Sequence, residues 1–154
     1  MVGANLLPVT PITGVNTLQL VSTAGPGPDV VALAATINPS LIVDIPRDTG
    51  AAAFAVATFN VGAAGNIQVS ADNGSLPISV TVCQTAGNGS CLGPPTSTVT
   101  VGIGSGGTPT FSFFVQGQGN VPFDPANNRI FAVFTDTATG NVVGKTSTAV
   151  RTTP

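Results

Sequence analysis

Histidine, glutamate, tyrosine and tryptophan are all absent from this sequence of 154 residues. A Ser-His-Asp or Cys-His catalytic centre needs an imidazole base, so the lack of histidine excludes that chemistry. A zinc site needs about four ligands, and two cysteines without histidine cannot provide the usual set. We therefore expect a protein that is not an enzyme and has no zinc.

A pair of carboxylates would be the remaining route to hydrolysis, because glycosidases and aspartic proteases need only two acids. Asp44 and Asp48 are close in the sequence, with Pro46 and Arg47 between them. Proline ends a strand ladder because it lacks a backbone N–H. This segment therefore predicts the end of a strand with a local ion pair to Arg47 rather than an active site.

Charge is scarce as well: only 6% of the residues are charged, and the formal net charge is −2. Proteins bind nucleic acid through many Lys and Arg side chains, which displace counterions from the phosphates. This sequence has four Lys and Arg residues in total. No apolar run approaches the roughly 18 to 20 residues of a membrane-spanning helix. We expect neither a nucleic-acid partner nor membrane insertion.

The start at Met1–Asn5 has no basic region of a signal peptide, so export implies a removed signal or a module of a longer protein.

The residues that the sequence does contain favour β-structure. There are 20 valines and 21 threonines against 8 leucines, and β-branched side chains suit a pleated sheet. Glycine and proline number 19 and 13, which indicates many turns. Apolar alternation between these turns predicts about ten strands in a β-sandwich of two antiparallel sheets. The expected strands are Leu18–Leu20, Val30–Ile37, Leu41–Ile45, Ala52–Val61, Ile67–Ala71, Ile78–Val82, Val99–Ile103, Phe111–Val115, Ile130–Phe134 and Val142–Val150.

One expected strand, Ala52–Val61, has apolar residues on both faces, which predicts burial on both sides. We expect a single domain over residues 15–154, preceded by an arm or linker over residues 1–14. The arm has four apolar side chains that could hold it in place: Leu6, Leu7, Val9 and Ile12. Either the arm packs along its own domain, or it inserts into a neighbouring copy as an added strand.

The two cysteines, Cys83 and Cys91, enclose a short glycine-containing loop. Such a loop brings two sulfurs together easily, so we predict a disulfide, with two unpaired buried thiols as the alternative. A disulfide indicates an oxidising, extracellular environment. Asn73-Gly74-Ser75 and Asn88-Gly89-Ser90 fit the glycosylation sequon, but both also fit ordinary glycine turns, which is the interpretation that we adopt.

The loop before the Ile130–Phe134 strand is a possible contact site. Phe123 is the aromatic side chain most open to exposure, although it could instead plug one end of the sandwich. Asp124, Asn127 and Asn128 provide hard oxygen atoms of the kind that calcium binds. The same residues also fit an Asx-turn leading into the strand. Apart from this calcium option we expect no cofactor.

Three segments carry a resemblance to a known family: Phe111–Val115, Val121–Phe131 and Thr146–Arg151. Their pattern of strands and turns, which extends over most of residues 32–151, resembles that of immunoglobulin-like modules of bacterial cell-surface proteins. The resemblance implies an immunoglobulin-like β-sandwich without catalytic residues, used as a tandem spacer, an adhesin stalk or an assembly subunit. The chain departs from antibody domains, because it has no core tryptophan and its cysteine pair is local rather than between sheets.

The sequence thus leads to the expectation of a structural module or subunit in an extracellular bacterial surface assembly, such as a filament, layer or stalk. Charged residues on edge strands normally prevent pairing with other chains, and this sequence has few of them. We therefore expect the partner to be a second copy or a neighbouring module of the same surface protein. The alternative is an extracellular module that binds carbohydrate or calcium.

Overall fold

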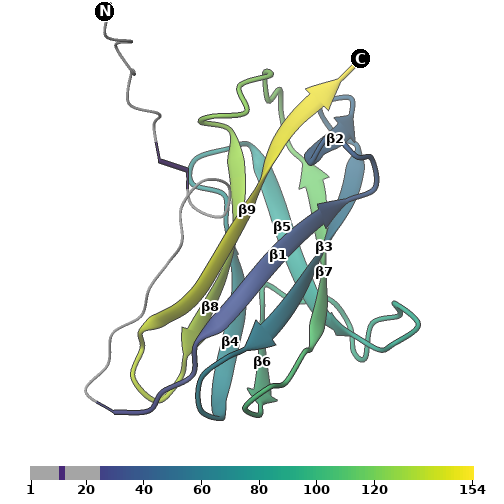
Figure 1. Ribbon diagram of the computed structural model, residues 1–154. Coiled ribbons are helices and arrows are strands. Elements are labelled where there is room, and N and C mark those ends of the chain that lie inside the picture. The colour runs from purple at the N-terminus through teal and green to yellow at the C-terminus, as the bar shows by residue number, and fades with distance from the viewer. Residues whose placement is uncertain (1–10, 13–24) are drawn as a thin grey trace, which may run out of the picture.

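The computed structural model describes residues 11–12 and 25–154, and within these ranges the chain forms nine strands and no helix (Figure 1). The all-β prediction is confirmed. Nine of the expected strands overlap an observed one, whereas Leu18–Leu20 lies outside the described residues. The strands are β1 (Val30–Thr36), β2 (Ile42–Pro46), β3 (Ala51–Asn60), β4 (Gly65–Asp72), β5 (Ile78–Thr85), β6 (Thr98–Ile103), β7 (Thr110–Gly117), β8 (Arg129–Asp136) and β9 (Val142–Thr153).

The strands form two sheets that face each other across a common core (Figure 1). One sheet has four strands in the order β1-β3-β7-β5, and all of its neighbours are antiparallel. The other has five strands in the order β2-β9-β8-β4-β6. Only β8 and β9 are neighbours both in the sequence and in a sheet, and the hairpin between them turns through Gly140, which has a φ of 72°. Each of the remaining connections, from β1 through to β8, carries the chain to the other sheet.

The prediction of two purely antiparallel sheets is wrong at one pair, because β2 and β9 run parallel. After β1, the turn at residues 37–41 carries the chain across to the five-stranded sheet, so β2 cannot form a hairpin with β1. The Asn38 side chain helps to shape this crossing, since it donates to the Asp44 carboxylate at 2.7 Å. β2 therefore joins the last strand of the chain, with Ile42 opposite Ala149 and Asp44 opposite Arg151. Alternation along a strand carries no information about the direction of its neighbour.

The core is filled by aliphatic and phenylalanine side chains from both sheets. Phe54 and Phe113 stack within the four-stranded sheet, with ring centroids 4.8 Å apart. Phe111 of this sheet meets Phe134 of the other in an edge-to-face contact at 5.7 Å. Phe111, Phe113 and Phe134 are fully buried. These contacts account for the alternation of buried and exposed residues that the sequence shows.

The expectation that Ala52–Val61 is buried on both faces is also wrong. In β3, Phe54 and Val56 point into the core, whereas Ala55 and Ala57 are exposed on the other side and Phe59 keeps 45% of its surface open. β3 lies in the interior of its sheet, between β1 and β7. The described residues form two layers, however, and no described element covers the outer face of this sheet. Its apolar residues there face outward.

Candidate interaction surface

Charge is distributed very unevenly between the two sheets. None of the residues in β1, β3, β5 or β7 is charged, so the four-stranded sheet has no charged side chain at all. Every charge that lies on a strand belongs to the five-stranded sheet. Those residues are Asp44, Asp72, Arg129, Asp136, Lys145 and Arg151.

The outer face of the four-stranded sheet is apolar over two adjacent strands and part of a third. The register places Val31 opposite Phe59, Leu33 opposite Ala57, and Ala53 opposite Phe114 on this face. Leu33 is 70% exposed. We call this surface the apolar face, and it comprises Val31, Leu33, Ala35, Ile37, Ala53, Ala55, Ala57, Phe59 and Phe114.

The apolar face is contiguous rather than a scatter of single residues. Ala35, Ile37 and Ala55 share one shallow depression on it. Its five large side chains are between 39% and 90% exposed. At about 200 Å² for a fully exposed large apolar side chain, they leave roughly 500 to 600 Å² of apolar surface open. That is the upper end of the range for the largest apolar patch on a monomeric protein, about 300 to 600 Å², and such patches are often functional.

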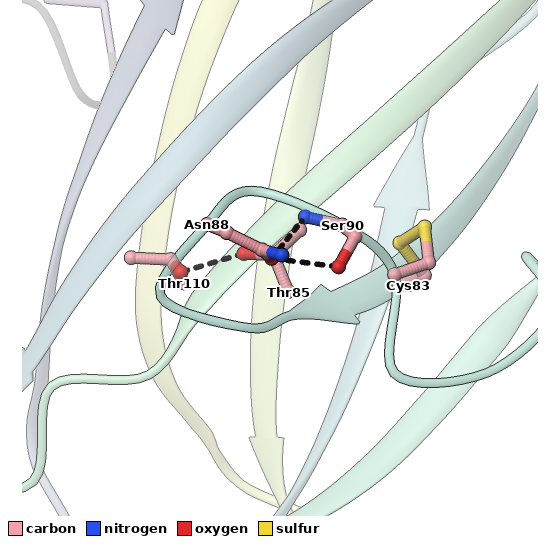
Figure 2. The surroundings of a disulfide bond; sticks show 6 residues. Cys83, Thr85, Asn88, Ser90 and Thr110 are labelled. Atoms are coloured by element: carbon pink, nitrogen blue, oxygen red, sulfur yellow. Dashed lines mark hydrogen bonds between the residues drawn. A yellow bond between two sulfur atoms is a disulfide. The ribbon is translucent and has the colours of Figure 1, made fainter.

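The two edges of the four-stranded sheet differ. At the β5 edge, the predicted disulfide between Cys83 and Cys91 is present and closes a loop over the strand (Figure 2). Leu92 N–H donates to the Gln84 carbonyl at 2.9 Å. Val82 and Thr96 exchange backbone hydrogen bonds at 2.7 and 3.0 Å. The loop thus occupies edge groups that would otherwise be open to another strand. The other edge is β1, which bears part of the apolar face.

Inside the disulfide loop, side chains hold a tight turn (Figure 2). The Asn88 Oδ1 atom accepts hydrogen bonds from the backbone N–H and the hydroxyl of Ser90, at 3.1 and 2.7 Å. The hydroxyls of Thr85 and Thr110 meet at 2.6 Å, which ties β5 to β7 next to the loop. At the other sequon, Asn73 donates to the Leu76 carbonyl in its own turn and to the Ile78 carbonyl at the start of β5. Both Asn-Gly-Ser segments are therefore turns.

In the loop of residues 121–128, the side chains of Asp124, Asn127 and Asn128 form hydrogen bonds within the loop. The Asp124 carboxylate accepts from the backbone and the side chain of Asn127, at 3.3 and 2.8 Å. The Asn127 side-chain hydrogen bond is the main cause that lowers the pKa of Asp124 below its usual value. Asn128 donates to the Pro122 carbonyl at 2.8 Å. The Asp124 side chain therefore holds a turn before β8, with its backbone hydrogen bond three residues on rather than the two of a strict Asx-turn.

Phe123 lies at the tip of the same loop and is 59% exposed, so it does not plug the core. Its ring packs under the Arg151 guanidinium, with 5.0 Å from the Cζ atom to the ring centroid. Nowhere in residues 11–12 and 25–154 do three or more His, Cys, Asp or Glu side chains gather as a metal ion would require.

The predicted ion pair between Arg47 and its neighbouring acids is wrong. Asp44 instead pairs with Arg151, whose Nε atom donates to the carboxylate at 2.7 Å. The parallel pairing of β2 and β9 places these two residues opposite each other, although they are far apart in the sequence. Arg47 and Asp48 are exposed in the turn after β2, where Arg47 has a φ of 58°.

The expected assembly arm falls mostly outside the described residues, which is the case for Leu6, Leu7 and Val9. Ile12 is described and is half-buried. The role of the arm therefore stays a prediction. Sequence reasoning missed the apolar face, because it predicted that the β3 segment is buried on both sides. The signal available in the sequence was the absence of charge from β1, β3, β5 and β7, but β6 of the other sheet is uncharged as well, so charge alone does not identify the face.

The sequence matches no protein-family model, and no curated protein matches it significantly. In the part of the chain that the structure describes, no helix is long and apolar enough to span a membrane.

Proposed function

We propose that this protein is a non-enzymatic structural module of an extracellular surface assembly, and that it associates with a second copy through the apolar face. The observation that carries the proposal is the charge-free four-stranded sheet, whose outer side leaves Leu33 and Phe59 substantially exposed. Burying such a surface removes apolar area from water without desolvating any charge.

A second copy is the partner that best fits this chemistry. A charged partner would gain nothing from a face without charged side chains, whereas the same face on another copy is equally apolar. Two-fold association places one patch against itself. A stable interface usually covers about 800 Å² on each partner, so the apolar face with its neighbouring threonines and serines has the size of a modest interface. Tethering of several copies in one assembly would strengthen a modest contact through effective concentration.

The strand order supports an immunoglobulin-like arrangement as part of this proposal. The sheet β1-β3-β7-β5 corresponds in position to the ABED sheet of an immunoglobulin domain, and β9-β8-β4 corresponds to the GFC strands. β2 and β6 are additions at the two edges of the second sheet. The chain departs from the usual path after β4, because it visits β5 before it returns to β6. The disulfide supports an extracellular location, since such bonds persist in oxidising compartments.

The test is to place a charge on the apolar face. We expect the wild-type protein to show concentration-dependent self-association in sedimentation velocity, and Leu33→Asp to weaken it by about tenfold or more, because a carboxylate would be desolvated in the interface. Thr100→Asp is the matched control, since it is also exposed on an edge strand but lies in the other sheet. A wild-type protein that stays monomeric, or equal effects of the two variants, would contradict the proposal.

The N-terminal arm offers a second, separable route to assembly. If the arm adds a strand to a neighbour, deleting residues 1–12 abolishes association, whereas Leu33→Asp leaves it intact. If the apolar face forms the contact, deleting residues 1–12 leaves association intact, whereas Leu33→Asp weakens it. Sedimentation velocity on both variants distinguishes the two modes, and the proposal requires the second result.

A further inference from the structure

A cavity of about 430 Å³ lies where β1, β2, β8 and β9 come together. Its walls are mostly apolar, with Leu33 and Ala34 from β1 and Leu41 and Ile42 from the start of β2. Thr146 and Thr148 of β9 add hydroxyl groups, and Arg129 of β8 provides the only charged side chain among the described residues that line it. Ligand cavities commonly have about this volume, roughly 300 to 1,000 Å³, with apolar walls and few polar groups.

Arg129 is buried, with only 8% of its surface exposed. Its Nε donates to the Ser147 hydroxyl at 3.0 Å, Nη1 to the Pro125 carbonyl at 2.7 Å, and Nη2 to the Ser147 carbonyl at 3.2 Å. All three acceptors are neutral oxygens. The single ion pair among the described residues joins Asp44 to Arg151, and the sequence has no acidic residue before Asp29. The Arg129 charge therefore has no carboxylate partner.

A buried guanidinium without a counter-charge is unusual, because burial disfavours the charged form. Burial accordingly lowers the pKa of Arg129. Arginine nevertheless stays protonated in proteins, so the charge remains. The hydrogen bonds described above use one N–H of each Nη atom, and each of these atoms carries a second N–H. Paired Nη donors match the two oxygens of a carboxylate.

We propose that this cavity binds a small aliphatic carboxylate, with the carboxylate on the Nη atoms of Arg129 and the hydrocarbon chain against Ala34, Leu41 and Ile42. The single positive charge matches a monoanion, whereas phosphate at neutral pH would bring excess negative charge into an apolar cavity. The apolar walls match an alkyl chain. This proposal does not rest on the proposed self-association, because the cavity is present in a single copy, although Leu33 belongs to both the cavity and the apolar face.

Hexanoate is the probe for this site. In the wild-type protein, we expect hexanoate to shift the Nε–H resonance of Arg129 in NMR spectra in a saturable way. We expect hexanoate to bind at least about tenfold more tightly than hexanol, which lacks the charge, and than inorganic phosphate, which lacks the chain. The absence of a saturable shift would overturn the proposal. So would equal binding of hexanol or of phosphate.

Substitutions test which side chains bind the carboxylate and which contact the alkyl chain. Arg129→Met should weaken hexanoate binding by about tenfold or more, whereas Arg151→Met should leave it unchanged, because Arg151 is already paired and does not line the cavity. Ile42→Ala should weaken hexanoate severalfold but leave acetate unaffected. Equal effects of Arg129→Met and Arg151→Met on hexanoate binding would contradict the proposal. If Arg129→Met does not fold, the wild-type titrations still decide the matter.

Discussion

Asp44 and Arg151 lie opposite each other in the parallel β2–β9 pair, and the Arg151 Nε atom donates to the Asp44 carboxylate at 2.7 Å. Asn38 donates to the other carboxylate oxygen, also at 2.7 Å. The two charged side chains are 35% and 30% exposed, so solvent screens their attraction. The pair thus joins the second and last strands of the chain through a contact of modest strength.

A double-mutant cycle of Asp44→Asn and Arg151→Met should give a coupling free energy of about 0.5 to 1 kcal/mol in urea unfolding, which decreases as salt is added. Arg47→Met is the matched control, because Arg47 is exposed and near Asp44 in the sequence. We expect its coupling to Asp44 to be close to zero. A larger coupling to Arg47 than to Arg151 would contradict the pairing seen in the structure.

Asn60 is fully buried and connects three loops. Its Oδ1 atom accepts from the backbone N–H groups of Asp29 and Gly62, and its Nδ2 atom donates to the carbonyls of Ala63 and Gly104. Asn60→Ala would leave these backbone groups unsatisfied in the interior. We expect a loss of about 2 to 4 kcal/mol in the free energy of unfolding, measured with urea.

The control for Asn60→Ala is Gln68→Ala, which removes an exposed amide from β4. We expect it to change the free energy of unfolding by less than about 0.5 kcal/mol. If both variants lose the same small amount, the hydrogen bonds of Asn60 do not stabilise the loops.

Asp124 should titrate below the usual aspartate pKa of 3.8, because the Asn127 side chain and nearby backbone N–H groups donate to its charged form. A lowered folded-state pKa means that this contribution to stability is present above the unfolded-state value and is lost as the pH falls through the folded-state value. NMR titration of the Asp124 carboxyl measures the midpoint. Asn127→Ala should raise the midpoint toward 3.8, and an unchanged midpoint would refute this assignment.

The disulfide should stabilise the fold by about 2 to 3 kcal/mol, because it closes a short loop in the unfolded chain. Reduction should lower the urea midpoint accordingly. It should also speed hydrogen exchange at the Leu92 and Thr96 amides, which pair with β5. The Cys83→Ala, Cys91→Ala double variant is the control, since a reductant should leave it unaffected. Stability that is the same with and without reductant in the wild-type protein would rule out this role.

The strands themselves could be predicted because the alternation of apolar and polar residues along a strand depends only on neighbouring positions in the sequence. Ile67 and Val69, for example, alternate with Gln68 and Ser70, and their burial in β4 follows the pattern. The same logic failed for β3. Apolar residues on both faces there were taken as a sign of two-sided burial, but the outer ones remain exposed. Local pattern alone does not distinguish a covered face from one that is left for a partner.

The disulfide was predictable because Cys91 follows Cys83 at a sequence separation of 8, and the loop between them contains two glycines. The pairing of Asp44 with Arg151 and the burial of Arg129 could not be predicted from the sequence. Both depend on β9 lying between β2 and β8, which brings together residues from distant parts of the chain.

The sequence by itself determined an all-β protein with little charge, many turns and one local disulfide, because these properties depend on residue type and short-range spacing. Only the tertiary structure decided which strands share a sheet, since strand pairing joins segments far apart in the chain. That choice brings β1, β3, β5 and β7, none of which is charged, into one sheet and puts all strand-borne charge in the other, which also contains the uncharged β6. The apolar face and the unpaired charge of Arg129 both follow from it.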